Sequence, residues 1–432
     1  MRRMWILSPA IFFLAAATLS AAEPKDWATE NLTKLVELYR HFHAHPELSL
    51  QEKETAAKVA AELKAVGCDV TTGIGGHGVV GLLKNGDGPT VMVRTDLDAL
   101  PVTEKTNLVY ASQKKVELDG QDVGVMHACG HDVHITNLIA IARYFAAHKD
   151  RWKGTLMFLG QPAEERGLGA RTMLDDKLFE RFKKPDFALA LHCDHTLATG
   201  QVSCRGGYML ANVDSVDITV KGKGGHGAYP HTTIDPIVQA AQLVLALQTV
   251  VSREIKPLEP CVITVGSIHG GSKHNIIGDD CHLQLTVRSY SDETRQALKD
   301  GIIRKAKGIA VSCGAPEPKI EFSEGTPALF NDEKLNTRMV NVFRRELGEG
   351  NVQMGEQSMG GEDFSEYGRA GVPICMYRLG SVNGKRLARY KELGQEPPSL
   401  HSPLYYPDVE EALPIAVQTM SAAILELLGT KK

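Results

Sequence analysis

The chain has 432 residues, of which 43% are apolar and 23% are charged, and its formal net charge is -4. This length exceeds what one hydrophobic core usually serves, so we expect two domains. No basic run or basic-aromatic stripe occurs, which argues against nucleic acid as a partner.

The first residues differ from the rest of the chain. Arg2 and Arg3 precede an apolar run from Trp5 to Leu19, and the small residues Ser20-Ala21-Ala22 follow. This pattern predicts a secretory signal peptide at residues 1–22 and a mature protein that is periplasmic or secreted, without stable membrane insertion after cleavage. The alternative is a retained membrane anchor, for which the apolar run is short.

The next elements are predicted helices, then strands. Residues 30–66 carry apolar side chains at helical intervals, interrupted at residues 45–49. Two apolar strands at residues 79–83 and 90–93 then flank a glycine-rich turn, and the second leads into Arg94-Thr95-Asp96-Leu97-Asp98-Ala99-Leu100-Pro101. Charged residues directly after a buried strand are candidates for a site.

Residues 126–132 carry the clearest chemistry in the chain. They read Met-His-Ala-Cys-Gly-His-Asp and therefore place two imidazoles, the Cys129 thiol and a carboxylate beside a glycine, all groups that bind divalent transition metals. Cys129 and His131 point the same way only where the backbone is extended or turns. Residues 133–149 have helical periodicity, so we predict the ligands on a strand-to-helix turn.

Two further apolar strands end in candidate ligands. Residues 154–160 run into Gln161-Pro162-Ala163-Glu164-Glu165, and residues 187–191 end at His192. Strands separated by helices predict an α/β fold whose sheet collects these groups at one carboxyl edge. If the backbone is extended at Glu164 and Glu165, their side chains diverge, one toward metal and one toward substrate. Taken alone, the pair also fits a solvated surface, and His192 also fits a satisfied core histidine.

The pattern changes at residue 213. Half-polar strands and two helices follow in the order β-α-β-β-α-β up to residue 324, which predicts an inserted ferredoxin-like α+β domain. The predicted organisation is therefore a signal peptide at 1–22, one domain formed by 23–212 and 325–432, and an inserted domain at 213–324. Within the insert, Gly224-Gly225-His226-Gly227 is either a tight turn or a hinge that presents His226 to a substrate oxygen.

The chain has eight cysteines, at positions 68, 129, 193, 204, 261, 281, 313 and 375. Their spacing gives no tight pairing pattern, and a chain of this length does not need disulfide stapling. We predict that most are small buried apolar residues, that some pairing remains open, and that Cys129 is a metal-bound thiolate.

Seven ordered motifs resemble the amidohydrolase branch of the M20 metallopeptidases, which includes hippurate hydrolases and plant hydrolases of auxin conjugates. The motifs lie at residues 94–101, 126–132, 161–165, 191–192, 224–228, 360–365 and 400–403. The resemblance covers nearly the whole mature chain. It implies a di-metal peptidase-like catalytic domain with an inserted lid that also mediates homodimerisation.

The resemblance also implies roles for individual residues. Cys129 would bridge two divalent ions whose other ligands are His131, Glu165, His192 and His401. Glu164 would be the catalytic base, and Asp96 would lie behind the site and orient a ligand. Arg94 stands where related enzymes have a histidine ligand, and we do not expect it to bind metal. His226 would stabilise the oxyanion from the lid of the partner subunit.

Two residues of the insert resemble lid residues that hold a substrate carboxylate. They are Asn275 and Arg288, and a guanidinium suits a bidentate grip. Their alternative reading is a capping amide and a sheet-edge arginine. The chain departs from the family at Val133, after His192 and in the long charged segment 385–398, which leaves the ligands intact and bears on substrate preference.

The resulting hypothesis is a metal-dependent hydrolase of C–N bonds that cleaves N-acyl amino acids, small-molecule substrates, to a carboxylate and a free amino acid. Its rivals are a dipeptidase or carboxypeptidase that uses the same metals, and a non-catalytic metal-binding protein. Thiolate and imidazole ligands favour zinc, whereas the carboxylates would also accept manganese, nickel or cobalt.

Overall fold

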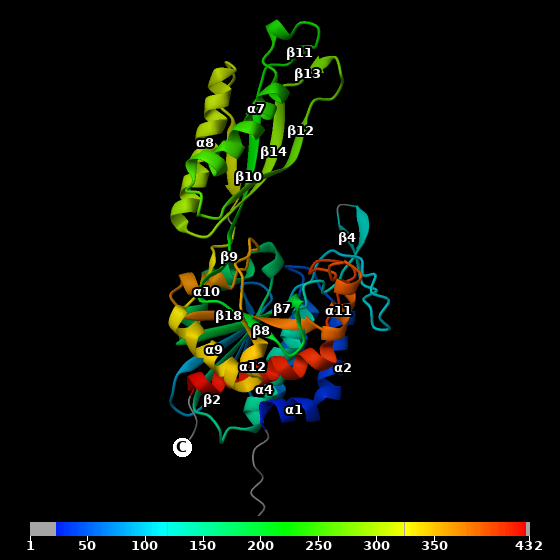
Figure 1. The fold of residues 1–432 in the computed structure, drawn as a ribbon, viewed down its shortest axis with the longest axis vertical. Helices are drawn as coiled ribbons and strands as arrows, with labels where there is room; N and C mark the ends of the chain where they lie inside the picture. The colour runs from blue at the N-terminus through cyan, green and yellow to red at the C-terminus, as the bar shows by residue number, and fades with distance from the viewer. Residues whose placement is uncertain (1–22, 119, 324, 429–432) are drawn as a thin grey trace, which may run out of the picture.

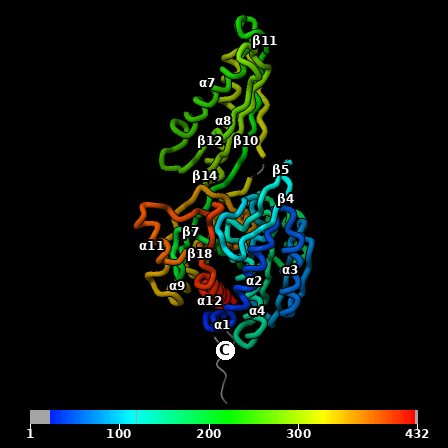
Figure 2. The backbone as a smooth tube through the Cα atoms, turned by 90° about the vertical axis from the view of Figure 1, so that its right-hand side faces the viewer, coloured from blue at the N-terminus to red at the C-terminus, as the bar shows by residue number. Residues whose placement is uncertain are grey.

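The computed structural model describes residues 23–118, 120–323 and 325–428, so the predicted signal peptide lies outside the described residues. The chain forms a larger and a smaller domain, which lie at opposite ends of its long axis (Figure 1, Figure 2). The larger domain is formed by segments on both sides of the smaller one, which is inserted between β9 (Gly207–Leu210) and β16 (Leu329–Asn331).

The larger domain is built on an eight-stranded mixed sheet. Its strand order is β1-β2-β6-β3-β7-β18-β8-β17, and the central strands β6, β3, β7 and β18 are parallel. Parallel strands buried on both faces account for the continuous apolar runs in the sequence. The strands span Asp69–Ile74 (β1), Gly78–Asn85 (β2), Thr90–Asp96 (β3), Gly154–Gln161 (β6), Phe187–Ala198 (β7), Val202–Cys204 (β8), Val352–Met354 (β17) and Ile374–Val382 (β18).

Helices cover both faces of this sheet because alternate strand residues point in opposite directions. Val91 and Val93 of β3 pack into one core, whereas Met92 packs into the other. The first core contains α1 (Pro24–Glu30), α2 (Leu32–Ala44), α3 (Lys53–Ala65), α4 (His131–Ala147), α9 (Glu333–Leu347) and α12 (Val409–Leu428); the second contains α5 (Gly169–Asp175), α6 (Leu178–Arg181) and α10 (Ser365–Arg369).

Helix α12 is long and apolar enough to cross a membrane by length and composition alone, but 78% of its apolar window is buried. It packs against α1, α4 and α9, as a core helix does. The remaining elements of this domain are the hairpin β4 (Lys115–Leu118) and β5 (Gln121–Gly124), the helix α11 (Gly384–Glu392) and two short 3-10 turns at Glu164–Arg166 and Glu349–Asn351.

The smaller domain is a four-stranded antiparallel sheet with its own apolar core. Its strand order is β12-β14-β10-β15, so the fourth strand in sequence lies beside the first and the third lies between the first and second. This order confirms the predicted ferredoxin-like arrangement. The elements are β10 (Asn212–Lys221), α7 (Pro236–Thr249), β12 (Val262–Gly270), β14 (Asp280–Ser289), α8 (Asp292–Ser312) and β15 (Lys319–Ser323), with a π-helical turn at Val250–Glu254.

A small two-stranded ribbon of β11 (Gly225–His226) and β13 (Ile276–Ile277) lies at the end of the smaller domain that is farthest from the larger one (Figure 1). At the opposite end the chain enters and leaves the smaller domain side by side, where the Val213 amide donates to the Thr326 carbonyl at 2.9 Å.

Strands β2 and β3 flank the turn at residues 85–88, as predicted, and β6 lies between them in the sheet. One local expectation was wrong. Strand β7 does not end at His192 but continues to Ala198. Its pairing with β3 stops at Ala190, however, so His192 lies just beyond the paired part of the two strands, level with the carboxyl end of β3 at Asp96.

Candidate metal centre

The turn at residues 129–131 places a thiol and an imidazole in one site. Gly130 has a left-handed backbone with φ 81°, and α4 begins at His131. A Cβ atom at Gly130 would lie 3.1 Å from both the Cβ and the Sγ of Cys193, so the turn needs glycine for its space as well as its conformation. The predicted strand-to-helix turn is therefore present, in turned rather than extended form.

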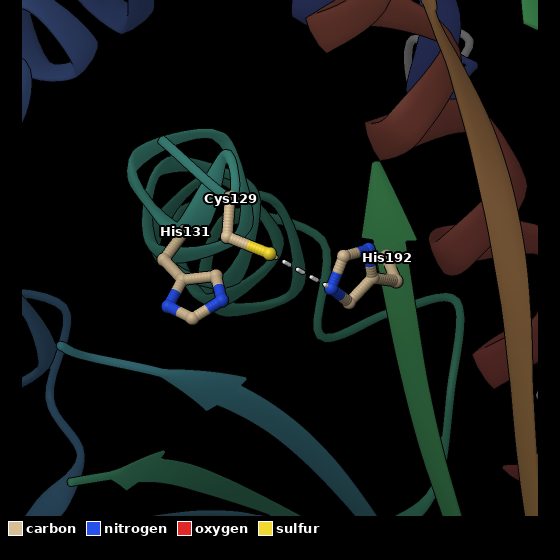
Figure 3. A group of neighbouring side chains, drawn as sticks. All are labelled: Cys129, His131 and His192. Carbon is tan, nitrogen blue, oxygen red and sulfur yellow. Dashed lines mark hydrogen bonds between the residues drawn. The ribbon is translucent and has the colours of Figure 1, made fainter. Parts of the chain in front are cut away.

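Two groups of three potential ligands share Cys129. One consists of Cys129, His131 and His192, and the other of Cys129, Glu165 and His401; in each group the ligand atoms lie within 4.8 Å of one another. The Cys129 Sγ lies 3.5 Å from the His192 Nε2 and 3.3 Å from the His401 Nε2. Figure 3 shows the first group, with the His131 and His192 rings on either side of the sulfur. One thiolate between two groups is suited to bridging two ions.

Each buried imidazole is oriented by a bond from its other nitrogen. The Nδ1 of His131 donates to the Asp98 carbonyl at 2.8 Å, and the Nδ1 of His192 donates to the Cys193 carbonyl at 2.8 Å. Both bonds leave the Nε2 lone pair directed into the site, as metal-binding histidines require. The residue whose backbone carbonyl orients the His131 ring is thus Asp98, for which no individual role was predicted.

His401 reaches the site from a loop just before α12. Its φ is 69°, a left-handed conformation that is uncommon for a residue with a side chain. Its amide donates to the Ala128 carbonyl at 2.8 Å, which ties the loop to the turn that carries Cys129. Strain of this kind persists where surrounding contacts impose it, and it is frequent at functional sites.

The backbone at Glu164 and Glu165 is not extended, so the condition under which their side chains would diverge is not met. The two residues begin a 3-10 turn, and carboxylate oxygens of both lie within 4.8 Å of a His131 ring nitrogen. The turn directs the side chains of Glu164 and Glu165 toward His131 because Ala163, just before the turn, has a left-handed backbone with φ 52°. Glu165 Oε1 lies 3.5 Å from the His401 Nε2, and Glu164 Oε2 lies 3.9 Å from the His131 Nε2.

Asp96 is part of a buried network beside the site. Its Oδ1 accepts a hydrogen bond from the Nδ1 of His134 at 2.8 Å, and the His134 Nε2 accepts from the Cys193 amide at 2.9 Å. Both nitrogens of His134 are thereby used within the protein. Asp96 Oδ2 pairs with Arg94 Nη1 at 2.8 Å and lies 3.7 Å from His131 Nε2.

Arg94 is enclosed by carboxylates. In addition to Asp96 it pairs with Glu362 Oε1 and Asp363 Oδ1, each 2.9 Å from Nη2. Glu362 and Asp363 in turn group with Glu164, with ligand-type oxygens within 4.8 Å. The Arg94 guanidinium is therefore the cation that balances these carboxylates, in agreement with the expectation that it does not bind metal. Glu362 and Asp363, like Asp98 and His134, were missed, although residues 360–365 were recognised as a motif.

The electrostatics of the site favour a bound cation. Burial, and next Glu362, raises the pKa of Glu164 well above its usual value, and burial raises the pKa of Glu165 to about 7. Burial also raises the pKa of the Cys129 thiol well above its usual range. Although burial opposes protonation of His131, the Asp96 carboxylate raises its pKa to about 10. A cation among these groups would favour the ionised acids, the thiolate and the neutral imidazole.

Three predicted residues lie in the smaller domain. His226 lies on β11, exposed, with its Nδ1 accepting from the Ala228 amide at 3.0 Å, and the Asn275 carbonyl accepts from the Gly227 amide at 2.9 Å. Both therefore lie at the end of this domain that is remote from the metal centre of the same chain (Figure 1). Arg288, on β14, lies at the opposite end, where its Nη1 approaches the Met359 carbonyl at 3.4 Å.

The residues present fit a pair of divalent ions. His131 Nε2 and Glu165 Oε1 are buried and have no hydrogen-bond partner in the part of the chain that the structure describes, a costly arrangement unless another group binds them. The donor set of one thiol, three imidazoles and a carboxylate is typical of transition-metal sites. The described residues thus assemble four ligands around one shared sulfur, and the unpartnered atoms point to a ligand of positive charge.

Comparisons with known proteins agree with this arrangement. A sequence model of peptidase family M20/M25/M40 matches residues 92–425. The chain is 34% identical to N-acetylcysteine deacetylase of Bacillus subtilis over 93% of this chain and 98% of that protein, and 38% identical to hippurate hydrolase of Campylobacter jejuni over 76% and 83%. A dinuclear metal-binding peptidase of the M20 family from Bacillus subtilis superposes with a TM-score of 0.75 and 31% identity, over 92% of this chain and 99% of that chain.

Proposed function

The chain belongs to peptidase family M20/M25/M40 and is a metal-dependent hydrolase of this family, and from that premise we propose that it cleaves the amide bond of N-acyl amino acids. The products would be a carboxylate and a free amino acid. The observation that carries the proposal is the convergence of two ligand groups on Cys129, with the Glu164 carboxylate beside them. Relatives named as a deacetylase and as a hippurate hydrolase support acylated amino acids as the substrate class.

In this proposal, His131 and His192 would hold one divalent ion, Glu165 and His401 would hold the other, and Cys129 would be shared by the two groups. Bound there, such ions act as Lewis acids that polarise the scissile carbonyl and lower the pKa of water. The chain supplies a soft thiolate and three imidazoles, two of which are oriented by backbone carbonyls, a set that favours zinc and also accepts manganese, nickel or cobalt. The prediction that Arg94 stays outside the ligand set is supported by its pairing with Glu362 and Asp363.

Glu164 is the general base of the proposed reaction. Its side chain is largely buried beside the ligands, and among the described residues no basic side chain pairs with it more closely than the His131 ring at 3.9 Å. It would accept a proton from the attacking water on a carboxylate oxygen and return that proton to the leaving amine. The network of Asp96, Arg94 and His134 holds the wall of the site in place around it.

The proposal includes a homodimer formed through the smaller domain, which would act as a lid. Strand β12 is an edge strand of that sheet, and Leu245 of α7 and Ile268 of β12 are 72% and 48% exposed. An unpaired edge with exposed apolar residues is suited to pairing with a second copy. His226 and Asn275 lie at the remote end of the smaller domain and would reach the partner's metal centre, where His226 would donate to the oxyanion. Arg288 lies at the opposite end, so Asn275 of one subunit and Arg288 of the other would together hold the substrate carboxylate.

Export is the last part of the proposal. It depends on the basic residues, apolar run and small residues at positions 2–22, and it predicts a mature protein that begins near Ala22 or Glu23. N-terminal sequencing of protein from culture medium or periplasm tests this directly. A full-length chain in the membrane fraction would favour the anchor instead.

The deciding experiment measures amino-acid release from N-acetyl, N-benzoyl and dipeptide substrates. Purified mature protein is compared with Glu164→Gln, each stripped of metal and then supplied with zinc or manganese. We expect cleavage of acyl substrates that requires metal, and a loss of about 10²–10⁴ in kcat for the variant at unchanged metal content. Turnover of dipeptides alone would establish the peptidase rival, and no turnover in a metal-loaded dimer would overturn the enzymatic proposal.

A further inference from the structure

The segment between α2 and α3 lies directly behind the metal centre. Leu48 forms a β-bridge with Ala99, and the Ala99 amide donates to the Glu47 carbonyl at 2.8 Å. Ser49 Oγ donates to Asp98 Oδ2 at 2.6 Å, and the same Oδ2 accepts from the Glu165 amide at 3.0 Å. The segment therefore contacts the ligand-bearing turns although it contributes no ligand itself.

Glu52, the last residue of this segment, has no exposed surface. Its Oε1 accepts two backbone hydrogen bonds, from Leu50 at 2.9 Å and from Ala163 at 2.7 Å. Both donors have left-handed backbones, with φ 69° at Leu50 and φ 52° at Ala163. Such conformations are unfavourable for residues with a Cβ and persist where neighbouring groups impose them.

The carboxylate of Glu52 does not serve its own helix. Glu52 is the residue before α3, but its side chain makes no capping bond to that helix. Glu47 performs that task instead, since its two oxygens accept from the amides of Glu54 at 3.2 Å and Thr55 at 2.7 Å. A helix-capping role therefore does not account for the burial of Glu52.

Ala163 immediately precedes the two carboxylates of the site. Its left-handed backbone turns the chain out of the extended strand β6 and into the 3-10 turn that begins at Glu164. With Ala163 held by Glu52 and Glu165 held by Asp98, the turn is fixed at two backbone amides, one on each side of Glu164. Small displacements of such groups weaken both metal binding and catalysis.

We propose that Glu52 is a positioning residue of this metal centre: its Oε1 imposes the left-handed turn at Ala163 and thereby sets the places of Glu164 and Glu165. This inference rests on the proposed function, in which Glu164 is the general base and Glu165 is a metal ligand. What Glu52 supplies is a hydrogen-bond acceptor, so glutamine, which keeps one carbonyl oxygen, should replace it. Glycine at position 163 adopts positive φ freely, so the turn should then depend much less on the hydrogen bond to Glu52.

The test titrates Co²⁺ alone into metal-free mature protein and records the thiolate-to-cobalt charge-transfer and d–d bands, which report on the ligand geometry. We expect Glu52→Ala to weaken Co²⁺ binding about 10- to 100-fold and to change the d–d bands. Glu52→Gln should remain within a few-fold of the wild type. Adding Ala163→Gly to Glu52→Ala should recover most of the lost affinity.

Glu47→Ala is the matched control, because it removes a partly buried carboxylate that also accepts two backbone hydrogen bonds, from the same segment and without touching Ala163. It should lower the melting temperature and leave the cobalt spectrum unchanged. The proposal is overturned if Glu52→Ala folds and keeps its cobalt affinity and spectrum, or if Glu52→Gln and the double variant are as impaired as Glu52→Ala. A wild type that binds cobalt but cleaves no acyl substrate would refute the proposed function alone.

Discussion

The Sγ of Cys129 lies 3.3 Å from the Nε2 of His401, although 272 positions separate the two residues in the chain. The same sulfur lies 3.5 Å from the Nε2 of His192 on β7. One atom at the beginning of a helix thus joins ligands from a central strand and from a distant loop. The whole candidate site depends on that sulfur.

Replacing Cys129 by alanine should therefore remove both ions. Each group of ligands keeps only two of its three members, and we expect affinity for zinc to fall by at least about 100-fold at both positions. Elemental analysis after dialysis against metal buffer measures the loss. Cys68→Ala is the control, since Cys68 is also a buried free thiol but belongs to the apolar core. Retention of one equivalent of metal would show that Cys129 does not bridge.

Removing the metals should destabilise the protein, because the ligands are assembled only in the folded state. At a free metal concentration of about 100 times Kd, the linkage contributes about 2.7 kcal/mol to unfolding free energy. Melting temperatures in chelator and after restoration of zinc or manganese measure it. The Cys129→Ala protein should melt at the same temperature with and without chelator. A wild type equally indifferent to chelator would contradict the metal assignment.

Replacing Arg94 by methionine should destabilise the fold strongly. The change leaves the buried Glu362 and Asp363 without their cation and leaves Asp96 with its bond from His134 but without its arginine, and breaking a buried pair in this way costs about 3–5 kcal/mol. Urea unfolding of metal-loaded protein gives the difference. Arg143→Met provides the comparison, because its pair with Glu62 is partly exposed and should contribute less than about 1 kcal/mol. Equal stabilities for the two variants would refute the role of Arg94 as the cation that balances these carboxylates.

A second buried network should make stability depend on pH. Burial alone would lower the pKa of His43, but its hydrogen bonds to Asp132 and Glu104 raise that pKa to about 9. A raised histidine pKa stabilises the fold fully below the unfolded value of about 6.5, and this contribution disappears as pH rises through about 9. The loss should amount to about 3 kcal/mol at most. The groups facing His43 are Asp132, Glu104, Tyr39, Tyr110 and His127.

The measurement is the unfolding free energy of metal-loaded wild type and His43→Gln between pH 6 and pH 10. Metal binding keeps the ligand histidines from titrating, so the difference between the proteins reports on His43. We expect the wild type to lose its advantage over the variant across this range. Parallel curves for the two proteins would show that His43 is neutral in the fold.

Much of the architecture is readable from the chain itself. Apolar runs in β3, β6 and β7 predicted a buried α/β sheet, and alternation in β10 and β14 predicted a half-exposed sheet, because each pattern reflects how many faces of a strand are covered. The helix that follows Gly130 was also predicted by periodicity. These are local properties, which neighbouring residues encode on their own.

Tertiary structure alone decided how the side chains meet. Ala163 has a left-handed backbone where an extended strand end was expected. Its amide donates a hydrogen bond to the carboxylate of Glu52, which lies 111 positions away in the chain. Arg94 pairs with Asp363, which lies 269 positions further along the chain, and His131 is oriented by the backbone carbonyl of Asp98. The sequence by itself determined which groups could bind metal and on which kind of element they lie. Their pairing required the fold, because hydrogen bonds between remote segments leave no periodic trace in the order of residues.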